Sequence, residues 1–135
     1  MRYAIYFTPS AEDALTRKAA AGLGRGAFST ADPGLSPDVP AVGAILFSHH
    51  TLAPRRYGFH GTIVAPFRPA DGIGERDILT ALEQFCRTQR SFIVSDLAIG
   101  RLGGFLTLVP GASCPQLNAM AASAVEFFHP CRAAP

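Results

Sequence analysis

The sequence predicts an α+β fold, in which helices accompany an antiparallel or mixed sheet. Short segments alternate apolar with other residues, as strands do, and longer segments repeat apolar residues at helical spacing. Gly103-Gly104 separates two strand-like segments, as a hairpin turn would. The 135 residues are 48% hydrophobic and 16% charged, which excludes intrinsic disorder and suits a chain of about one domain.

The N-terminal third predicts one strand, one helix and a long connection. Alternating aromatic and aliphatic side chains indicate a strand over residues 2–8. Ser10 and Asp13 have the spacing of a capping box, which predicts a helix over about 11–23. Residues 24–54 contain many glycines and prolines, and we expect a long irregular connection there, a kind of segment that is often functional.

The remaining chain predicts three strands and two helices. Strands are expected over 57–67, 91–99 and 105–109, and helical spacing of apolar residues indicates a helix over about 75–88. A capping-box pattern that starts at Ser113, with a proline in the first turn, predicts the last helix. The predicted order is therefore β-α-loop-β-α-β-β-α.

Two parts of the chain look alike and predict an internal repeat. Tyr6–Pro9 precedes a capped helix, and Leu106–Pro110 also precedes a capped helix. On this interpretation residues 1–101 form a first β-α-β-α-β lobe, and residues 102–135 begin a second, truncated lobe. The high apolar content would then belong to a face prepared for further strands or for a partner.

Charge and cysteine content restrict the function classes. A net charge of +2 does not favour nucleic acid or a membrane as a partner. No segment approaches the ~20 apolar residues of a membrane span, and the N-terminus lacks a signal-peptide pattern, so a cytoplasmic location is expected. Cys86, Cys114 and Cys131 lack metal-binding spacing, which predicts buried thiols in a reducing compartment and no metal site.

A polar cluster at residues 55–62 is the main candidate site. Side chains two apart on a strand share a face, about 7 Å apart, so His60 and Thr62 should lie side by side. An imidazole transfers protons near neutral pH, and a hydroxyl can donate to a phosphoryl oxygen. Arg56 and Tyr57 would add donors for an anion. The simpler alternative is a sheet histidine that makes one hydrogen bond.

His60-Gly61-Thr62-Ile63 resembles the His-x-Thr-hydrophobic motif of the two-histidine (2H) phosphoesterase superfamily. Residues 2–9, 55–67 and 101–106 are similar to a branch of it assigned to phosphonate metabolism. The resemblance implies a LigT-like architecture of two β-α-β-α-β lobes, each with one His-x-Thr/Ser motif. Across a cleft, one histidine would act as general base and the other as general acid on a cyclic phosphate or related phosphodiester.

The resemblance also implies which residues form the site, what substrate it binds and whether it needs a cofactor. His60 and Thr62 would be catalytic, and Arg56, Tyr57 and Arg101 would bind the phosphate or substrate. The substrate would be a small phosphorylated molecule, and neither a metal nor another cofactor would be needed.

The sequence departs from this pattern at two places. Gly61 stands where alanine is usual, and Val64 where lysine is usual, so a positive charge is missing from the expected cleft side of the strand. A second motif is missing too: His49-His50-Thr51 fits only formally and is interpreted as surface, and His129 is expected at a helix end.

The missing second histidine leaves three readings of the function open. We expect a 2H phosphoesterase-like protein that is weakly active or inactive as this chain alone. The first alternative is a phosphate- or nucleotide-binding module that performs no chemistry. The second is an inactive fragment that forms a homodimer and so covers its open face.

Overall fold

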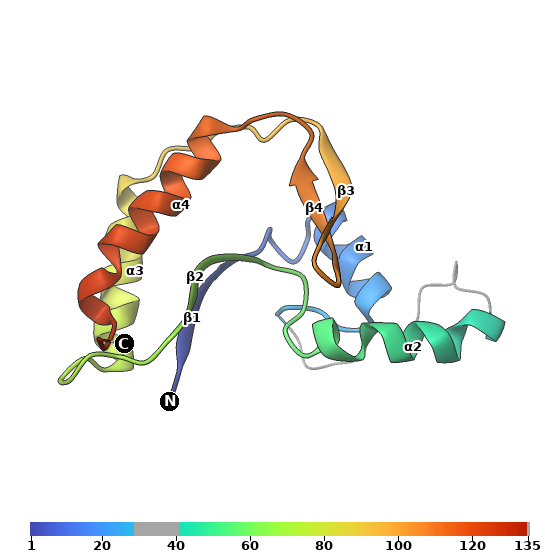
Figure 1. The fold of residues 1–135 in the computed structure, drawn as a ribbon, viewed down its shortest axis with the longest axis horizontal. Helices are drawn as coiled ribbons and strands as arrows, with labels where there is room; N and C mark the ends of the chain where they lie inside the picture. The colour runs from blue at the N-terminus through green and yellow to red at the C-terminus, as the bar shows by residue number, and fades with distance from the viewer. Residues whose placement is uncertain (29–40, 135) are drawn as a thin grey trace. The chain divides into compact units, whose positions relative to one another are not determined.

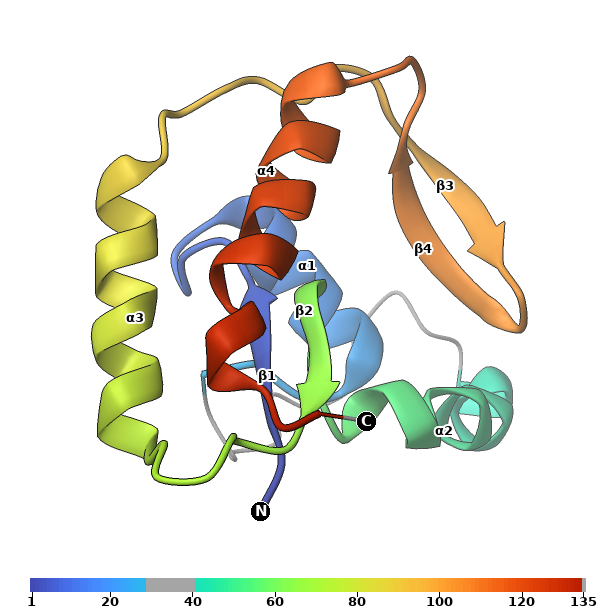
Figure 2. The same cartoon turned by 60° about the vertical axis from the view of Figure 1, so that its left-hand side comes forward.

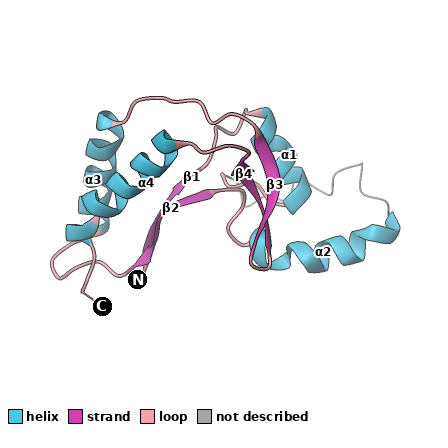
Figure 3. Cartoon of the chain, turned by 45° about the horizontal axis from the view of Figure 1, so that its top comes forward, coloured by secondary structure: helices cyan, strands magenta, loops and turns pink. Residues whose placement is uncertain are grey.

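The computed structural model describes residues 1–28 and 41–134 (Figure 1). The elements, in chain order, are β1 (Tyr3–Phe7), α1 (Ala14–Leu23), α2 (Ala41–Arg55), β2 (Gly61–Phe67), α3 (Glu75–Thr88), β3 (Leu97–Leu102), β4 (Phe105–Pro110), α4 (Pro115–Phe127) and the 3₁₀ helix His129–Cys131. Two sheets of two strands pair β1 with β2 and β3 with β4 (Figure 3). This mixture of helices and small sheets confirms the α+β class.

The chain forms two compact units. One is Ile5–Thr62, and the other combines Met1–Ala4 with Ile63–Pro135. The strands β1 and β2 contribute residues to both units, and their arrows run in opposite directions (Figure 2). The lobes expected at residues 1–101 and 102–135 stay a prediction.

In the unit Ile5–Thr62, helix α1 does not begin with the capping box that was predicted from Ser10 and Asp13. Asp13 is itself the N-cap, and its carboxylate accepts a hydrogen bond from the Leu15 amide at 2.8 Å. Ser10 contributes only its carbonyl, which accepts from the Asp13 amide in a turn. The helix therefore begins at Ala14, because an acidic side chain next to the first turn satisfies one of its unpaired amides. Gly24, in the left-handed region with φ 69°, ends it.

The expected irregular connection contains a helix, α2, that the sequence analysis missed. Its prolines and glycines are concentrated before residue 41, and the expectation for residues 29–40 lies outside the described residues. Within α2 the only proline is Pro54, in the last turn. The end of α2 is tied to α1, because the Arg55 guanidinium donates to the Leu23 carbonyl at 2.9 Å and to the Thr51 hydroxyl at 2.8 Å.

The second unit has a core of aliphatic and aromatic side chains between α3 and α4, which lie side by side (Figure 2). Phe85 of α3 contacts Phe127 and Phe128 at centroid separations of 5.4 and 5.7 Å. The other buried apolar residues of this unit are Val64, Phe67, Ile78 and Ala124. The helix predicted at 75–88 is confirmed as α3.

Two expectations about β2 are wrong. The strand begins at Gly61 rather than at residue 57, because Gly58 adopts a left-handed φ of 72° that interrupts extended backbone. Val64 was expected on the cleft side of the strand, but it is only 1% exposed and belongs to the core. The next residue, Ala65, is exposed. The burial of Val64 and Phe67, three residues apart, shows that the core covers only part of each side of this strand.

The third predicted strand corresponds to β3 of the β3–β4 hairpin. It begins at Leu97, not at residue 91 as predicted. Leu97 pairs with Pro110, and Gly111 donates its amide to the Asp96 carbonyl at 2.7 Å, which closes the ladder there. Residues 91–95 therefore have no partner strand within the described part of the chain. The turn at Gly103 and the strand after it follow the prediction.

The last helix is confirmed, although its predicted capping box does not form. Cys114 is the N-cap of α4 and makes no side-chain capping bond, while Pro115 occupies the first turn. The proline reduces the need for such a cap, because it has no amide hydrogen to satisfy. Among the described helices, none has the length and apolar character needed to cross a membrane.

Candidate functional site

The site begins at Gly58, a buried residue between α2 and β2. Its φ of 72° is strained for residues with a side chain, and an added Cβ would lie 2.8 Å from the Ala27 Cα. Only glycine therefore fits here, where the backbone turns with a positive φ close to the backbone of Ala27. The turn brings the Gly58 carbonyl within 2.9 Å of His60 Nδ1.

That contact determines which nitrogen of His60 holds a hydrogen. A carbonyl oxygen only accepts, so Nδ1 must donate to Gly58. In the neutral ring the hydrogen is then on Nδ1, and Nε2 has a free lone pair. His60 is half-buried and directly precedes β2, which leaves Nε2 as the atom that can accept a proton from a reactant.

Aromatic side chains lie against the imidazole. The Tyr6 ring, from β1, stacks on the His60 ring with a centroid separation of 4.0 Å and an interplanar angle of 29°. The Tyr57 ring lies 6.2 Å away at 58°. Sequence analysis missed Tyr6, although the alternation in β1 places it on the side opposite buried Ile5. Nothing in the sequence indicates that this side meets His60.

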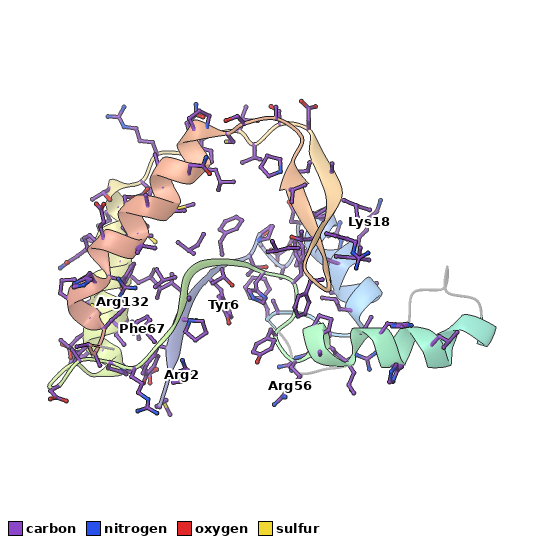
Figure 4. All side chains as sticks on the ribbon, viewed as in Figure 1. Arg2, Tyr6, Lys18, Arg56, Phe67 and Arg132 are labelled. Carbon is purple, nitrogen blue, oxygen red and sulfur yellow. The ribbon has the colours of Figure 1, made fainter. Side chains whose placement is uncertain are left out.

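The two arginines before the site have different roles. Arg55 is part-buried and bonded to the end of α1 and to Thr51. Arg56 is exposed, and its carbonyl accepts from Arg25 Nη1 at 2.9 Å, which fixes the backbone ahead of the site. Figure 4 shows Arg56 in the segment after α2 and Tyr6 on β1. The Arg56 guanidinium therefore suits an anion ligand better than that of Arg55.

Four of the five residues that the sequence singles out belong to the same compact unit. Arg56, Tyr57, His60 and Thr62 belong to the unit Ile5–Thr62, and Thr62 is an exposed residue of β2. Arg101 belongs to the other unit, where it is exposed on β3 opposite Leu106. The side-by-side placement of the His60 and Thr62 side chains stays a prediction.

The other histidines lie on helices. His49 and His50 are exposed on α2, where their rings meet edge to face at 5.7 Å, and His129 begins the 3₁₀ helix. His49-His50-Thr51 is therefore not a strand motif. In the described ranges, no three His, Cys, Asp or Glu side chains are grouped as a metal site would require.

Comparison with known proteins places the chain among relatives that are longer. Residues 62–135 match a family described as protein of unknown function (DUF1045). A ribose 1,5-bisphosphate phosphokinase PhnN from Janthinobacterium sp. (strain Marseille) is 33% identical over 132 residues, 98% of this chain and 29% of the relative. The protein of the same name from Laribacter hongkongensis (strain HLHK9) is 31% identical over 125 residues, 93% of this chain and 29% of the relative.

The chain thus spans less than a third of the length of these curated relatives. No solved structure matches it significantly. The family match begins at Thr62, so His60 and the residues before it lie outside the matched segment.

Proposed function

The chain belongs to the DUF1045 family, whose description assigns no function, and we propose that it is a two-histidine phosphoesterase-like protein. Its substrate would be a small cyclic phosphate or phosphodiester, and its setting phosphonate metabolism. The observation that carries this proposal is the bond from His60 Nδ1 to the Gly58 carbonyl, which leaves Nε2 as the proton-accepting atom.

The chemistry is a hydrolysis with two proton transfers. His60 Nε2 takes a proton from water while the water oxygen bonds to phosphorus. The ring P–O bond then breaks, and the departing sugar oxygen receives a proton from a general acid. In the reverse assignment, protonated His60 is that acid. Thr62, Arg56 and Tyr57 would donate to the phosphoryl oxygens, and the family resemblance adds Arg101 to this set.

The names of the two relatives support a sugar phosphate as the substrate class. Both are named for an enzyme of ribose 1,5-bisphosphate, a phosphorylated pentose. A pentose whose phosphate forms a ring with a neighbouring hydroxyl is the cyclic counterpart of such a molecule. We infer that this chain binds a substrate of that kind, without a metal or another cofactor.

Turnover by this chain alone is expected to be low. The resemblance implies a second histidine on a His-x-Thr/Ser strand, whereas His49, His50 and His129 lie on helices. Loss of one proton-transfer group costs roughly 10²–10⁴-fold in rate. The chain alone should therefore be slower than a protein with both motifs by about that factor.

Hydrolysis of a 2′,3′-cyclic nucleotide and of a cyclic ribose phosphate tests the assignment. Any turnover of the wild-type chain should fall to the uncatalysed rate in His60→Ala, and it should fall in Thr62→Ala as well. His50→Ala, which removes an exposed imidazole from α2, is the matched control and should retain turnover. Turnover that is unchanged in His60→Ala would refute the site.

A binding module without chemistry is the second candidate, favoured by the absence of a second strand motif among the chain's histidines. It predicts that cyclic phosphate shifts the NMR signals of His60 and Thr62 while no product forms. In that case His60→Ala should weaken binding, and product analysis over a long incubation should stay negative.

The exposed hairpin favours a third candidate, a homodimer. The antiparallel register places Leu97, Ile99 and Leu106 on one face of this hairpin, where their side chains are 50, 79 and 78% exposed. We propose that a second copy covers this face. Sedimentation should then give the mass of a dimer, and Ile99→Lys with Leu106→Lys should give a monomer. A monomeric wild type would exclude this candidate.

A further inference from the structure

Tyr6, on β1, contacts His60, which directly precedes β2. It lies on β1, next to β2 in the sheet, and its side chain is 40% exposed while that of Ile5 is buried. The Tyr6 and His60 rings are nearly parallel, with centroids 4.0 Å apart. This is closer than the ~4.5–7 Å usual for aromatic pairs, so the two ring faces are in direct contact.

The stack and the Gly58 bond constrain the imidazole in complementary ways. Rotation about the Cβ–Cγ bond of His60 would drive a ring edge into the Tyr6 face, so the stack holds the ring plane. Two orientations related by a half-turn share that plane. Only one of them places Nδ1 at the Gly58 carbonyl, so the hydrogen bond selects between them.

We propose that Tyr6 is a positioning residue for His60, which keeps Nε2 pointed in one direction. This inference rests on the proposed function and adds a residue that lies outside the His-x-Thr motif. The aromatic ring performs the role, and the phenol hydroxyl is not needed. Tyr6→Phe should therefore behave as wild type, and Tyr6→Leu should free the imidazole to rotate.

Loss of the Tyr6 ring should lower kcat and leave KM nearly unchanged. A misoriented base lowers the rate of the chemical step and leaves most substrate contacts intact. Loss of one aromatic pair corresponds to about a 2- to 10-fold decrease. We expect kcat of Tyr6→Leu to fall by that factor with KM nearly unchanged, and Tyr6→Phe to restore it.

NMR of the full chain tests the proposal without activity. In the wild type, the ring current of Tyr6 should move the His60 ring protons upfield, and long-range proton–nitrogen spectra should show hydrogen on Nδ1. Tyr6→Phe should keep both signatures. Tyr6→Leu should lose the upfield shift and show averaging of the two ring nitrogens.

Phe7→Leu is the matched control. Phe7 is the next residue of β1, is 60% exposed and is also aromatic, and it shares no ring contact with His60 in the described structure. Its replacement should leave the His60 signals unchanged. Should Phe7→Leu alter them as much as Tyr6→Leu does, the effect would be a general loosening of the strand, and the proposal would be wrong.

Two further outcomes would overturn the proposal: wild-type His60 ring protons without an upfield shift, and a Tyr6→Leu spectrum identical to wild type. If Tyr6→Leu does not fold, the wild-type shift and its retention in Tyr6→Phe decide the matter. Titration of the wild type with 2′,3′-cyclic AMP is a separate arm. If the His60 signals do not change in that titration, the proposed function is refuted, while the inferred stacking of Tyr6 on His60 is unaffected.

Discussion

Replacement of Gly58 by alanine should both destabilise the chain and release His60. The residue has φ 72°, and a left-handed conformation costs a residue with a side chain about 1–2 kcal/mol. The new Cβ would also lie 2.8 Å from the Ala27 Cα, a backbone atom that cannot rotate away. Such an overlap typically costs about 1–3 kcal/mol. The free energy of unfolding should therefore fall by about 2–5 kcal/mol.

Gly24→Ala is the matched control, because Gly24 belongs to the same unit and has φ 69°. The nearest atoms to its added Cβ would be those of the Arg55 guanidinium, 3.2 Å away, and a shift of that side chain by a few tenths of an ångström would relieve the contact. Gly24→Ala should thus cost only the conformational part, about 1–2 kcal/mol. The difference between the two variants isolates the contact with Ala27.

Urea unfolding followed by circular dichroism measures both losses, and NMR follows His60. Gly58→Ala should lose more stability than Gly24→Ala and should also alter the His60 nitrogen signals, because the Gly58 carbonyl holds Nδ1. Gly24→Ala should leave those signals in place. Equal losses of stability in the two variants, with unchanged His60 signals, would refute this account of the turn.

Three further predictions concern the fold. Phe128→Ala removes a side chain that is 0% exposed, and the free energy of unfolding should drop by about 3–5 kcal/mol in thermal or urea unfolding. Partial burial, and then the charge and hydrogen bond of Glu75, raise the pKa of Tyr3 above 10.0. The unfolded chain then loses this proton first, so stability should fall above pH 10, and a pH series should show a smaller fall in Tyr3→Phe. Asp13→Ala should lose about 1 kcal/mol through its N-cap, whereas Ser10→Ala should change little in the same unfolding assay.

Elements with a strong local pattern were predictable from the sequence. Helix α3 has its predicted bounds because its apolar residues repeat at helical spacing and a segment containing Pro69 and Gly72 precedes it. The helix α2 was missed because nearby prolines and glycines indicated a loop, while its own residues have no strong amphipathic pattern. The start of β3 was misplaced because a strand requires a partner, and the pairing ends at Leu97 opposite Pro110.

The sequence also limited most of the candidate site to one segment, residues 55–62. His60, Thr62, Arg56 and Tyr57 are close in the chain, so any fold would place them near one another. Arg101 depends on tertiary structure, and it belongs to the other compact unit. The burial of Val64 could not be read from alternation, because it depends on the tertiary packing around that part of the strand.

By itself, the sequence determined the α+β class, the location of most elements and a histidine with acid–base potential. Only the tertiary structure decided the chemical state of that histidine. Gly58 supplies the acceptor that keeps hydrogen on Nδ1, and Tyr6 supplies the face that holds the ring plane. The physical reason is that a proton's position on imidazole depends on the acceptor beside each nitrogen. Here the acceptor depends on a left-handed turn, and the ring plane depends on a strand about fifty residues earlier in the chain.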